Sequence, residues 1–348
     1  AKNPLLWAGQ GILYAEASDL LATLAELIPA PVVTTNPGKS AIPENHPLAL
    51  GASTRSRPKM FTEFMARADM VLAIGSSLTK TPFGPGIPSG KKIIHATNEA
   101  GDINKEYSVD HSLVGDAGLM LEALIEEVRL QKGAGGETEL VALEDEVAAV
   151  KRVWQEEWSA HLNSDEVPIN QYRVIRDLMR TVDRDTVIIT HDSGSPREQL
   201  LPFWETTVAG SYMGWGKSTQ LGYSLGLTMG AKLAAPDKLC VNVMGDSAIG
   251  MTGMDIETAA RYGIGTLTIV FNNGVMAAER QVLKISDEKF GAMAVGGNYA
   301  KVAEGLNVAS TRVEKPADIV PAIKDAVGIT QSGAPFLLEV VVKEGYDF

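Results

Sequence analysis

The sequence has very little cysteine and no long apolar run. Among its 348 residues only Cys240 is a cysteine, so no disulfide can form within the chain, and a reducing cytoplasm is the expected compartment. No apolar run reaches the roughly 20 positions that a membrane-spanning helix needs, and the residues after Ala1 do not resemble a signal peptide. We therefore expect a cytoplasmic protein without a membrane partner.

Positive charge is also scarce. Lys and Arg together number 31, against 43 Asp and Glu, which gives a formal net charge of −12 at pH 7. Because an acidic surface repels a phosphate backbone, we expect no nucleic-acid partner. The chain is long enough for two domains with substantial cores. Its first residue, Ala1, is not a methionine, and we expect a chain that was processed, cut or encoded separately.

What the sequence does have is a regular alternation of short apolar runs and helical patterns. The apolar runs predict buried parallel strands, and the segments between them predict crossover helices. This alternation indicates an α/β protein with two doubly wound parallel-sheet domains, of which the first is Rossmann-like. In the first domain we expect strands at 4–8, 31–34, 69–75, 91–95 and 112–115 and helices at 17–28 and 119–130.

A Gly-rich polar stretch at 131–139 (QKGAGGETE) marks the boundary between the domains. We place the first domain at 1–131, a linker with a helical arm at 132–167, and the second domain at 168–348. In the second domain we expect strands at 186–190, 239–244, 266–271 and 335–342 and helices at 168–182, 222–232, 251–262, 299–306 and 316–327.

The stretch from Gly245 to Glu279 carries the strongest chemical signal. Asp246 and Asn273 follow two predicted strands, whose carboxyl ends meet at one edge of a parallel sheet. The carboxylate of Asp246, the amide oxygen of Asn273 and the backbone carbonyl of Val275 are hard ligands that suit Mg²⁺ bound to a diphosphate. Simple turns after the strands are the alternative, but the pairing within one βαβ unit favours the metal site.

Two segments rich in Gly and Ser are expected to bind the diphosphate. Gly245 permits close approach of the backbone, and the amides of Ser247 and Ala248 lie near the start of a helix, where anions bind. Gly194 and Ser195 follow another predicted strand and can hold phosphate oxygens through amides and a hydroxyl. A helix N-cap is the alternative for this second segment and is compatible with phosphate binding.

These motifs resemble a known family. Gly245-Asp246-Ser247 with Asn272-Asn273 resembles the thiamine diphosphate motif of the pyruvate oxidase and acetolactate synthase superfamily. Residues 245–262 look most like the oxalyl-CoA decarboxylase and 2-hydroxyacyl-CoA lyase branch. The resemblance covers nearly the whole chain and implies thiamine diphosphate and Mg²⁺ as cofactors. It also implies that the Thr219 carbonyl accepts from the aminopyrimidine and that Leu221 forces the bent shape of the cofactor.

The branch implies a carbon–carbon lyase of the EC 4.1 class. Such an enzyme, dependent on thiamine diphosphate and Mg²⁺, would cleave a 2-hydroxyacyl-CoA to formyl-CoA and a ketone or aldehyde. The alternatives within the superfamily are an acetolactate synthase-like carboligase and a 2-oxoacid or oxalyl-CoA decarboxylase. The alternative outside enzymes is an inactive scaffold subunit, although every expected metal ligand is present. The sequence does not identify the acyl chain of the substrate.

The first domain resembles the middle domain of this superfamily, which binds FAD in some members and ADP or part of CoA in others. FAD is not expected, because the strand ending in Ala96-Thr97-Asn98 has no acid to hold the ribose. The basic loop Arg55-Ser56-Arg57-Pro58-Lys59 suits CoA phosphates, and a solvated surface is its alternative. The turn Gly9-Gln10-Gly11 is only a weak indication of a nucleotide site, and a tight βα turn is its preferred interpretation.

The resemblance also implies a part that this sequence does not include. In the family, a glutamate that activates the cofactor comes from an N-terminal pyrimidine-binding domain, usually on a neighbouring subunit. This sequence starts where the middle domain starts, so we expect that domain in a longer chain or in a separate subunit. A homodimer or homotetramer is the expected assembly, and the 348 residues alone are expected to have no turnover.

Glu279 is the expected acid–base residue. It lies at the place where the family's pyruvate decarboxylases carry a glutamate over the reactive carbon, whereas typical oxalyl-CoA decarboxylases do not. A carboxylate there can take the proton of the substrate hydroxyl as the carbon–carbon bond breaks. An exposed acid beside Arg280 at a helix start is the alternative.

Overall fold

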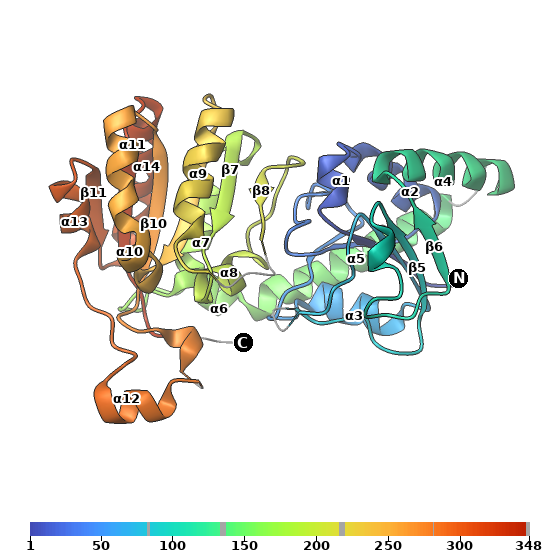
Figure 1. Ribbon diagram of the computed structural model, residues 1–348, viewed down its shortest axis with the longest axis horizontal. Helices are drawn as coiled ribbons and strands as arrows, with labels where there is room; N and C mark the ends of the chain where they lie inside the picture. The colour runs from blue at the N-terminus through green and yellow to red at the C-terminus, as the bar shows by residue number, and fades with distance from the viewer. Residues whose placement is uncertain (82–83, 133–136, 216–219, 281, 346–348) are drawn as a thin grey trace. The chain divides into compact units, whose positions relative to one another are not determined.

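The chain folds into two compact units (Figure 1). The computed structural model describes residues 1–81, 84–132, 137–215, 220–280 and 282–345. One unit comprises Ala1–Trp158 with Glu205–Lys217, and the other comprises Ser159–Trp204 with Ser218–Phe348. No helix in these ranges is both long and apolar enough to cross a membrane.

The first unit is built on a parallel sheet in the order β3-β2-β1-β4-β5-β6. Its strands are β1 (Pro4–Ala8), β2 (Val32–Thr34), β3 (Ala49–Ala52), β4 (Met70–Ile74), β5 (Lys92–Thr97) and β6 (His111–Val114). The predicted doubly wound parallel sheet is confirmed. Strand β3 was not predicted, because its sequence ALGA is short and contains Gly51, whose φ is +79°.

Helices cover both faces of this sheet. They are α1 (Gly11–Tyr14), α2 (Ser18–Leu27), α3 (Lys59–Arg67), η1 (Ala100–Asp102), α4 (Ala117–Lys132) and α5 (Glu137–Glu157). Leu6 and Ala8 of β1 lie in one core cluster with residues of α2 and α4. Trp7 points to the opposite face and contacts Phe61 of α3, with 6.2 Å between the ring centroids. Figure 1 shows α2 with α4 and α3 with α5, pairs that are in contact.

The turn Gly9-Gln10-Gly11 is a close backbone contact. A Cβ atom at Gly9 would lie 2.2 Å from the carbonyl oxygen of Gly75, and one at Gly11 would lie 2.7 Å from the Cα of Gly75. The Gly11 amide donates to Gly75 O at 2.8 Å. These glycines are therefore required for packing at the ends of β1 and β4, as the tight-turn interpretation predicts.

The second unit contains a parallel sheet in the order β11-β12-β10-β9-β7. The bounds are β7 (Val187–His191), β9 (Leu239–Gly245), β10 (Thr266–Asn272), β11 (Ala309–Val313) and β12 (Phe336–Val341); β8 (Tyr212–Met213) lies in the segment 205–217 of the first unit. The strands predicted at 186–190, 239–244, 266–271 and 335–342 are confirmed. Strand β11 was not predicted, because only one of its residues is fully buried.

The helices of the second unit include those predicted at 168–182, 222–232, 299–306 and 316–327. They are α6 (Ser159–Leu162), α7 (Gln171–Thr181), η2 (Arg184–Thr186), α8 (Ser195–Leu200), α9 (Tyr223–Ala234), α10 (Asp246–Thr252), η3 (Gly253–Asp255), α11 (Ile256–Tyr262), η4 (Ala277–Glu279), α12 (Lys284–Phe290), α13 (Tyr299–Gly305), η5 (Pro316–Asp318) and α14 (Ile319–Gln331).

The single helix predicted at 251–262 is wrong. The chain becomes helical at Asp246, directly after β9, and the helix is interrupted by the 3₁₀ turn η3 before α11 begins. Gly253 opens this turn, and glycine lowers the stability of a helix interior. Met254, an apolar residue inside the predicted helix, is 67% exposed and is therefore not a core residue.

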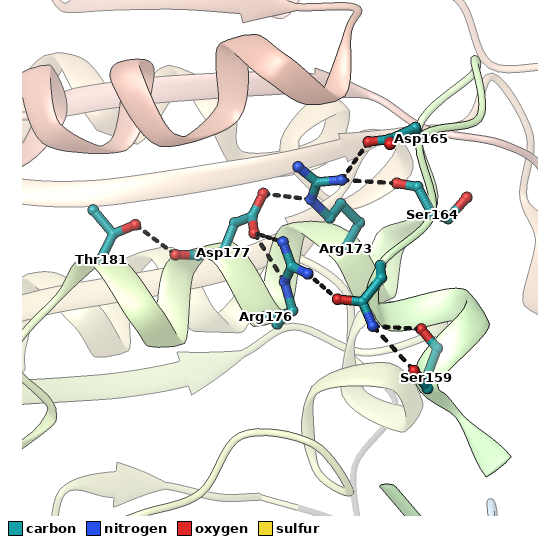
Figure 2. Close-up of polar contacts among 8 residues, drawn as sticks. Ser159, Ser164, Asp165, Arg173, Arg176, Asp177 and Thr181 are labelled. Atoms are coloured by element: carbon teal, nitrogen blue, oxygen red, sulfur yellow. Dashed lines mark hydrogen bonds and ion pairs between the residues drawn. The ribbon is translucent and has the colours of Figure 1, made fainter. Parts of the chain in front are cut away.

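A polar network holds the start of the second unit against α7 (Figure 2). The buried carboxylate of Asp177 accepts from Arg173 Nε at 2.7 Å and from Arg176 Nη2 at 2.6 Å. The same two arginines donate to Ser164 O, at 3.1 Å, and to the side chain of Asn163. One buried acid thereby fixes the segment that leads into the second sheet.

Candidate active site

The ends of three neighbouring strands meet at one edge of the second sheet. Strand β9 lies between β7 and β10 and is parallel to both. The register pairs Phe271 with Gly245 and His191 with Val243, so the three strands end at nearly the same level. The loops that follow them therefore share this edge, where open α/β sheets bind ligands.

Asp246 and Asn273 lie side by side at that edge, as the sequence predicts. Asp246 Oδ2 accepts hydrogen bonds from the amides of Asn273, at 3.1 Å, and Gly274, at 2.8 Å. Its Oδ1 accepts from the amide of Ser247 at 2.7 Å. A single carboxylate thus joins the end of β9 to the end of β10.

The Asp246 carboxylate is buried and has no cationic side chain as a partner within the described ranges. The residue is 3% exposed, and burial raises its pKa, while the backbone donors Gly274, Ser247 and Asn273 oppose that rise. A buried carboxylate is costly unless a cation compensates its charge. A divalent cation bound here fits this carboxylate.

Asn273 and Val275 carry the other expected ligand atoms. Asn273 Oδ1 accepts from Val275 N at 3.1 Å, and Val275 O accepts from Ala277 N at 2.9 Å. Gly274 has a φ of +75°, and Val275 forms a β-bridge with Ala294, so the turn is held on both sides. Carbonyl and amide oxygens have a second lone pair, so both atoms keep the capacity to bind a metal.

The donors at this edge are oxygens of different kinds: one carboxylate, one side-chain amide and one backbone carbonyl. This set suits Mg²⁺ that keeps water or phosphate oxygens as its other ligands. Across the residues that the structure describes, no group of three or more His, Cys, Asp or Glu side chains is placed to hold a metal. The metal expected here therefore depends on the mixed oxygen set.

Gly194 and Ser195 adjoin the same edge. Gly194 is the N-cap of α8 and has φ +86° and ψ −150°, a conformation that favours glycine. A Cβ at Gly194 would lie 4.0 Å from the Cβ of Ala278, and one at Gly245 would lie 3.9 Å from Cγ of Pro196. The segment after β7 is therefore in contact distance of the segments after β9 and β10.

The helix α10 begins directly at the candidate metal site. Its N-cap, Gly245, is in an extended conformation, and Ser247 and Ala248 form the first turn. The Ser247 amide donates to Asp246 Oδ1 at 2.7 Å, and its expected role toward the diphosphate stays a prediction. Ala248 is buried in the core cluster beneath the edge.

Leu221 packs beside the same core cluster. It is partly buried and contacts the group that contains Met244, Ala248 and Tyr299. This position is compatible with its expected contact with the cofactor. The expected pyrimidine contact at Thr219 lies outside the described residues.

Asp192 is a residue to which the sequence analysis gave no role. Its buried carboxylate accepts from the amides of Gly222, at 3.0 Å, and Ser224, at 3.2 Å, and from the Ser224 hydroxyl. Gly222 has a φ of +88° and lies so close to Thr252 that an added Cβ would be 2.2 Å from Thr252 Cγ2. Asp192 therefore fixes the start of α9 next to Leu221. No local sequence signal points to this cap, because 30 positions separate Asp192 from Gly222.

Glu279 lies in η4 and is partly exposed. In the described part of the chain, its carboxylate makes no hydrogen bond or ion pair. The adjacent residue Arg280 forms an ion pair with Glu344. Because Ala278 is next to Gly194, Glu279 lies one residue from the shared edge. Its acid–base role stays a prediction.

The basic loop of the first unit contains Lys59, Arg55 and Arg57. Lys59 forms an ion pair with Glu157 of α5, whereas Arg55 and Arg57 are exposed. At the end of β5, Thr97 is followed by the exposed acid Glu99, which caps η1 by accepting from Gly101 N at 3.0 Å. The expectations for CoA, ADP and FAD in this unit stay predictions.

Two family descriptions match the chain. Residues 1–124 match "Thiamine pyrophosphate enzyme, central domain", and residues 192–340 match "Thiamine pyrophosphate enzyme, C-terminal TPP binding domain". The second match contains Asp192, Asp246 and Asn273. The first unit and the second unit thus contain the two domain types that the resemblance implied.

Several curated proteins are similar over nearly the whole chain. A "Probable acetolactate synthase large subunit" of Methanococcus aeolicus is 27% identical, covering 98% of this chain and 58% of the relative. "Glyoxylate carboligase" of Escherichia coli O157:H7 is 26% identical, covering 99% of this chain and 60% of the relative. "3D-(3,5/4)-trihydroxycyclohexane-1,2-dione hydrolase" of Clostridium perfringens is 25% identical, covering 93% of this chain and 56% of the relative. The chain thus spans less than two thirds of each relative, and the expected CoA-dependent branch stays a prediction.

Proposed function

Because the chain belongs to the thiamine pyrophosphate enzymes through both of its domains, we propose that it acts on a carbon–carbon bond beside a carbonyl group. In this proposal it binds thiamine diphosphate and Mg²⁺ at the edge formed by β7, β9 and β10. The observation that carries the proposal is the buried Asp246 carboxylate. It joins two strand ends and has no cationic side chain to compensate it in the described part of the chain.

Each residue at the edge has a separate task. Asp246, Asn273 and Val275 would hold Mg²⁺ through a carboxylate, an amide oxygen and a backbone carbonyl. Gly194 with Ser195, and Gly245 with Ala248, would contact the diphosphate, because helix starts and Gly-rich turns favour anions. Thr219 and Leu221 would hold the pyrimidine end, and Ser247 would orient Asp246.

The chemistry is divided between cofactor and protein. Thiamine diphosphate, when bound, supplies the electron sink that lets a bond beside a carbonyl break or form. Glu279 would move a proton at the substrate oxygen, taking it when a hydroxyl becomes a carbonyl and returning it in the reverse direction. Its carboxylate is partly exposed and has no hydrogen-bond or ion-pair partner among the residues that the structure describes, so it is available for that task.

We infer that the first candidate activity is that of a carboligase, with small 2-oxoacids as its substrates. The names of two similar proteins, an acetolactate synthase and a glyoxylate carboligase, support this class. The second candidate is a 2-hydroxyacyl-CoA lyase that releases formyl-CoA and a ketone or aldehyde. The exposed guanidinium groups of Arg55 and Arg57, and the likeness of residues 245–262 to that branch, support the second candidate.

The proposal includes a partner domain. The glutamate that activates the cofactor would come from a pyrimidine-binding domain, in the same full-length chain or in a second subunit. A homodimer or homotetramer in the cytoplasm would then be the working form. The 56–60% coverage of the three relatives leaves room for such a domain in proteins of their length.

Two experiments test this function. Calorimetric titration of thiamine diphosphate into the chain should give binding that depends on Mg²⁺, and absence of binding at millimolar cofactor would contradict the proposal. The complete enzyme should then be supplied separately with glyoxylate, pyruvate and a 2-hydroxyacyl-CoA, and its products identified by mass spectrometry. Joined 2-oxoacid products support the carboligase, formyl-CoA supports the lyase, and no product from any of the three contradicts both.

A further inference from the structure

Beyond the three metal ligands, we propose that Glu339 is a positioning residue that fixes the loop carrying Asn273. The inference rests on the proposed metal site and concerns how the chain holds it. Glu339 lies in β12, in register with Val270 of β10 and Arg312 of β11. It is a fully buried carboxylate in the middle of a sheet, where an apolar side chain is the usual occupant.

Both oxygens of this carboxylate have partners. Oε1 accepts from Asn272 Nδ2 at 2.6 Å and from the guanidinium of Arg312. Oε2 accepts from Ala300 N, in the first turn of α13, at 2.9 Å. A buried acid with this many donors is well satisfied and holds β10, β11 and α13 in one arrangement.

The partner that connects Glu339 to the site is Asn272. This residue is the last of β10, and Asn273 follows it directly. Its side-chain amide also donates to Gly297 O at 3.3 Å, and its carbonyl accepts from Val342 N at 2.9 Å. Asn272 is thus held by its side chain and its backbone, and the hydrogen bond to Glu339 is the shortest of these three.

The next residue along the chain is the proposed metal ligand. Asn273 N donates to Asp246 Oδ2 at 3.1 Å, so the position of Asn272 sets where this amide meets Asp246 and where the Asn273 side chain starts. Groups that orient metal ligands typically change metal affinity about 10–100-fold when they are removed. Glu339 acts in this way through Asn272, without touching the ion.

A glutamine at position 339 tests the need for a carboxylate. Glutamine has the same shape as glutamate, but one of its two terminal atoms is an NH₂ group that cannot accept a hydrogen bond. One carboxylate oxygen of Glu339 accepts from Ala300 N, and the other accepts from Asn272 and Arg312. In either orientation, the NH₂ group would therefore face a donor. We therefore expect Glu339→Gln to release Asn272. Asn272→Ala removes the same link and leaves Glu339 paired with Arg312 and Ala300.

The measurement is Mn²⁺ binding to the 348-residue chain in the presence of thiamine diphosphate, followed by electron paramagnetic resonance. Glu339→Gln and Asn272→Ala should each weaken Mn²⁺ binding at least about 10-fold. The double variant should be no weaker than the weaker single variant, because both changes remove one link. Circular dichroism and thermal unfolding report whether each variant is folded.

Ser310→Ala is the matched control. Ser310 Oγ donates to Ala300 O at 2.8 Å, so this change weakens the contact of β11 with α13 and leaves Asn272 untouched. Mn²⁺ binding should be unchanged in this variant. The proposal is overturned if Ser310→Ala weakens binding as much as Glu339→Gln does, or if a folded Glu339→Gln binds like the parent.

If Glu339→Gln does not fold, Asn272→Ala decides, and parental affinity in that variant overturns the proposal. If the parent chain binds no Mn²⁺ with thiamine diphosphate, the proposed function and this inference both fail. If the parent binds Mn²⁺ and the variants bind equally well, only the inference fails.

Discussion

The amide nitrogen of Gly274 lies 2.8 Å from Oδ2 of Asp246, although 28 positions separate the two residues in the sequence. This contact holds the loop after β10 at the end of β9 through the protein's own hydrogen bonds. The protein thus brings its proposed ligand atoms together with backbone donors, and an ion would bind a site whose geometry is largely formed. Preformed sites lose less conformational entropy when they bind.

Replacing Asp246 by Asn removes the only formal charge among the proposed metal ligands. The amide keeps the size of the side chain but leaves Mg²⁺ and diphosphate poorly neutralised, so we expect thiamine diphosphate affinity to fall by at least about 100-fold. Isothermal titration calorimetry at fixed Mg²⁺ measures the change. Asp255→Asn, at an exposed position of η3, is the control and should bind like the parent. Parental affinity in the Asp246 variant would remove Asp246 from the site.

Two glycines near the start of α9 should respond in opposite directions to alanine. At Gly222, φ is +88° and an added Cβ would meet Thr252 at 2.2 Å, so Gly222→Ala should lower the free energy of unfolding by at least about 2 kcal/mol. Gly226 lies on the exposed side of α9, within the helix, where an added Cβ would meet nothing within 4 Å. Gly226→Ala should therefore raise the free energy of unfolding by about 0.5–1 kcal/mol. Urea unfolding followed by circular dichroism measures both. Equal effects at the two positions would contradict the geometry of the Gly222 turn.

The lone thiol gives a prediction on alkaline pH. Burial in β9 raises the pKa of Cys240 to about 11, from an ordinary value of 9.0. Because the raised pKa favours the protonated thiol in the folded state, this contribution to stability is complete below pH 9 and is lost as the pH rises toward 11. The parent should therefore lose more stability than Cys240→Ala between pH 9 and 11.

Urea unfolding of both proteins at several pH values in this range measures the difference. The other groups that titrate there are common to both proteins and cancel. Identical pH dependence in the two would show that Cys240 ionises freely. The native thiol should also react with a disulfide reagent at pH 8 far more slowly than the same thiol in urea.

Glu279→Gln separates binding from proton transfer in the complete enzyme. Glutamine keeps the shape of the side chain and cannot take a proton, so kcat should fall by at least about 100-fold while cofactor affinity stays unchanged. Glu288→Gln, on the exposed surface of α12, is the control. If the Glu279 variant turns over at the parental rate, its carboxylate is only a surface charge on the loop.

Much of the candidate site could be predicted from the sequence because its chemistry follows strand ends. Parallel strands end at the same edge, so apolar runs followed by Asp246 and Asn273 were enough to place the two residues together. The same pattern predicted the two α/β units and most of their strands. It failed at β3 and β11, which are short or mostly exposed, and at η3, where Gly253 interrupts a pattern that reads as one helix.

The sequence by itself determined which residue types stand at the strand ends, and thereby the α/β class and the place of the proposed cofactor. Only the tertiary structure decided how those residues are held. Asp192 meets Gly222 across 30 positions, and Glu339 meets Asn272 across 67. The apolar pattern that predicts a strand or helix does not reveal such a pair, because each element is predicted from its own residues and not from a distant partner. The contacts exist because the sheet order brings β7 to β9 and β12 to β10, and a buried carboxylate must then find donors on whichever neighbour packs against it.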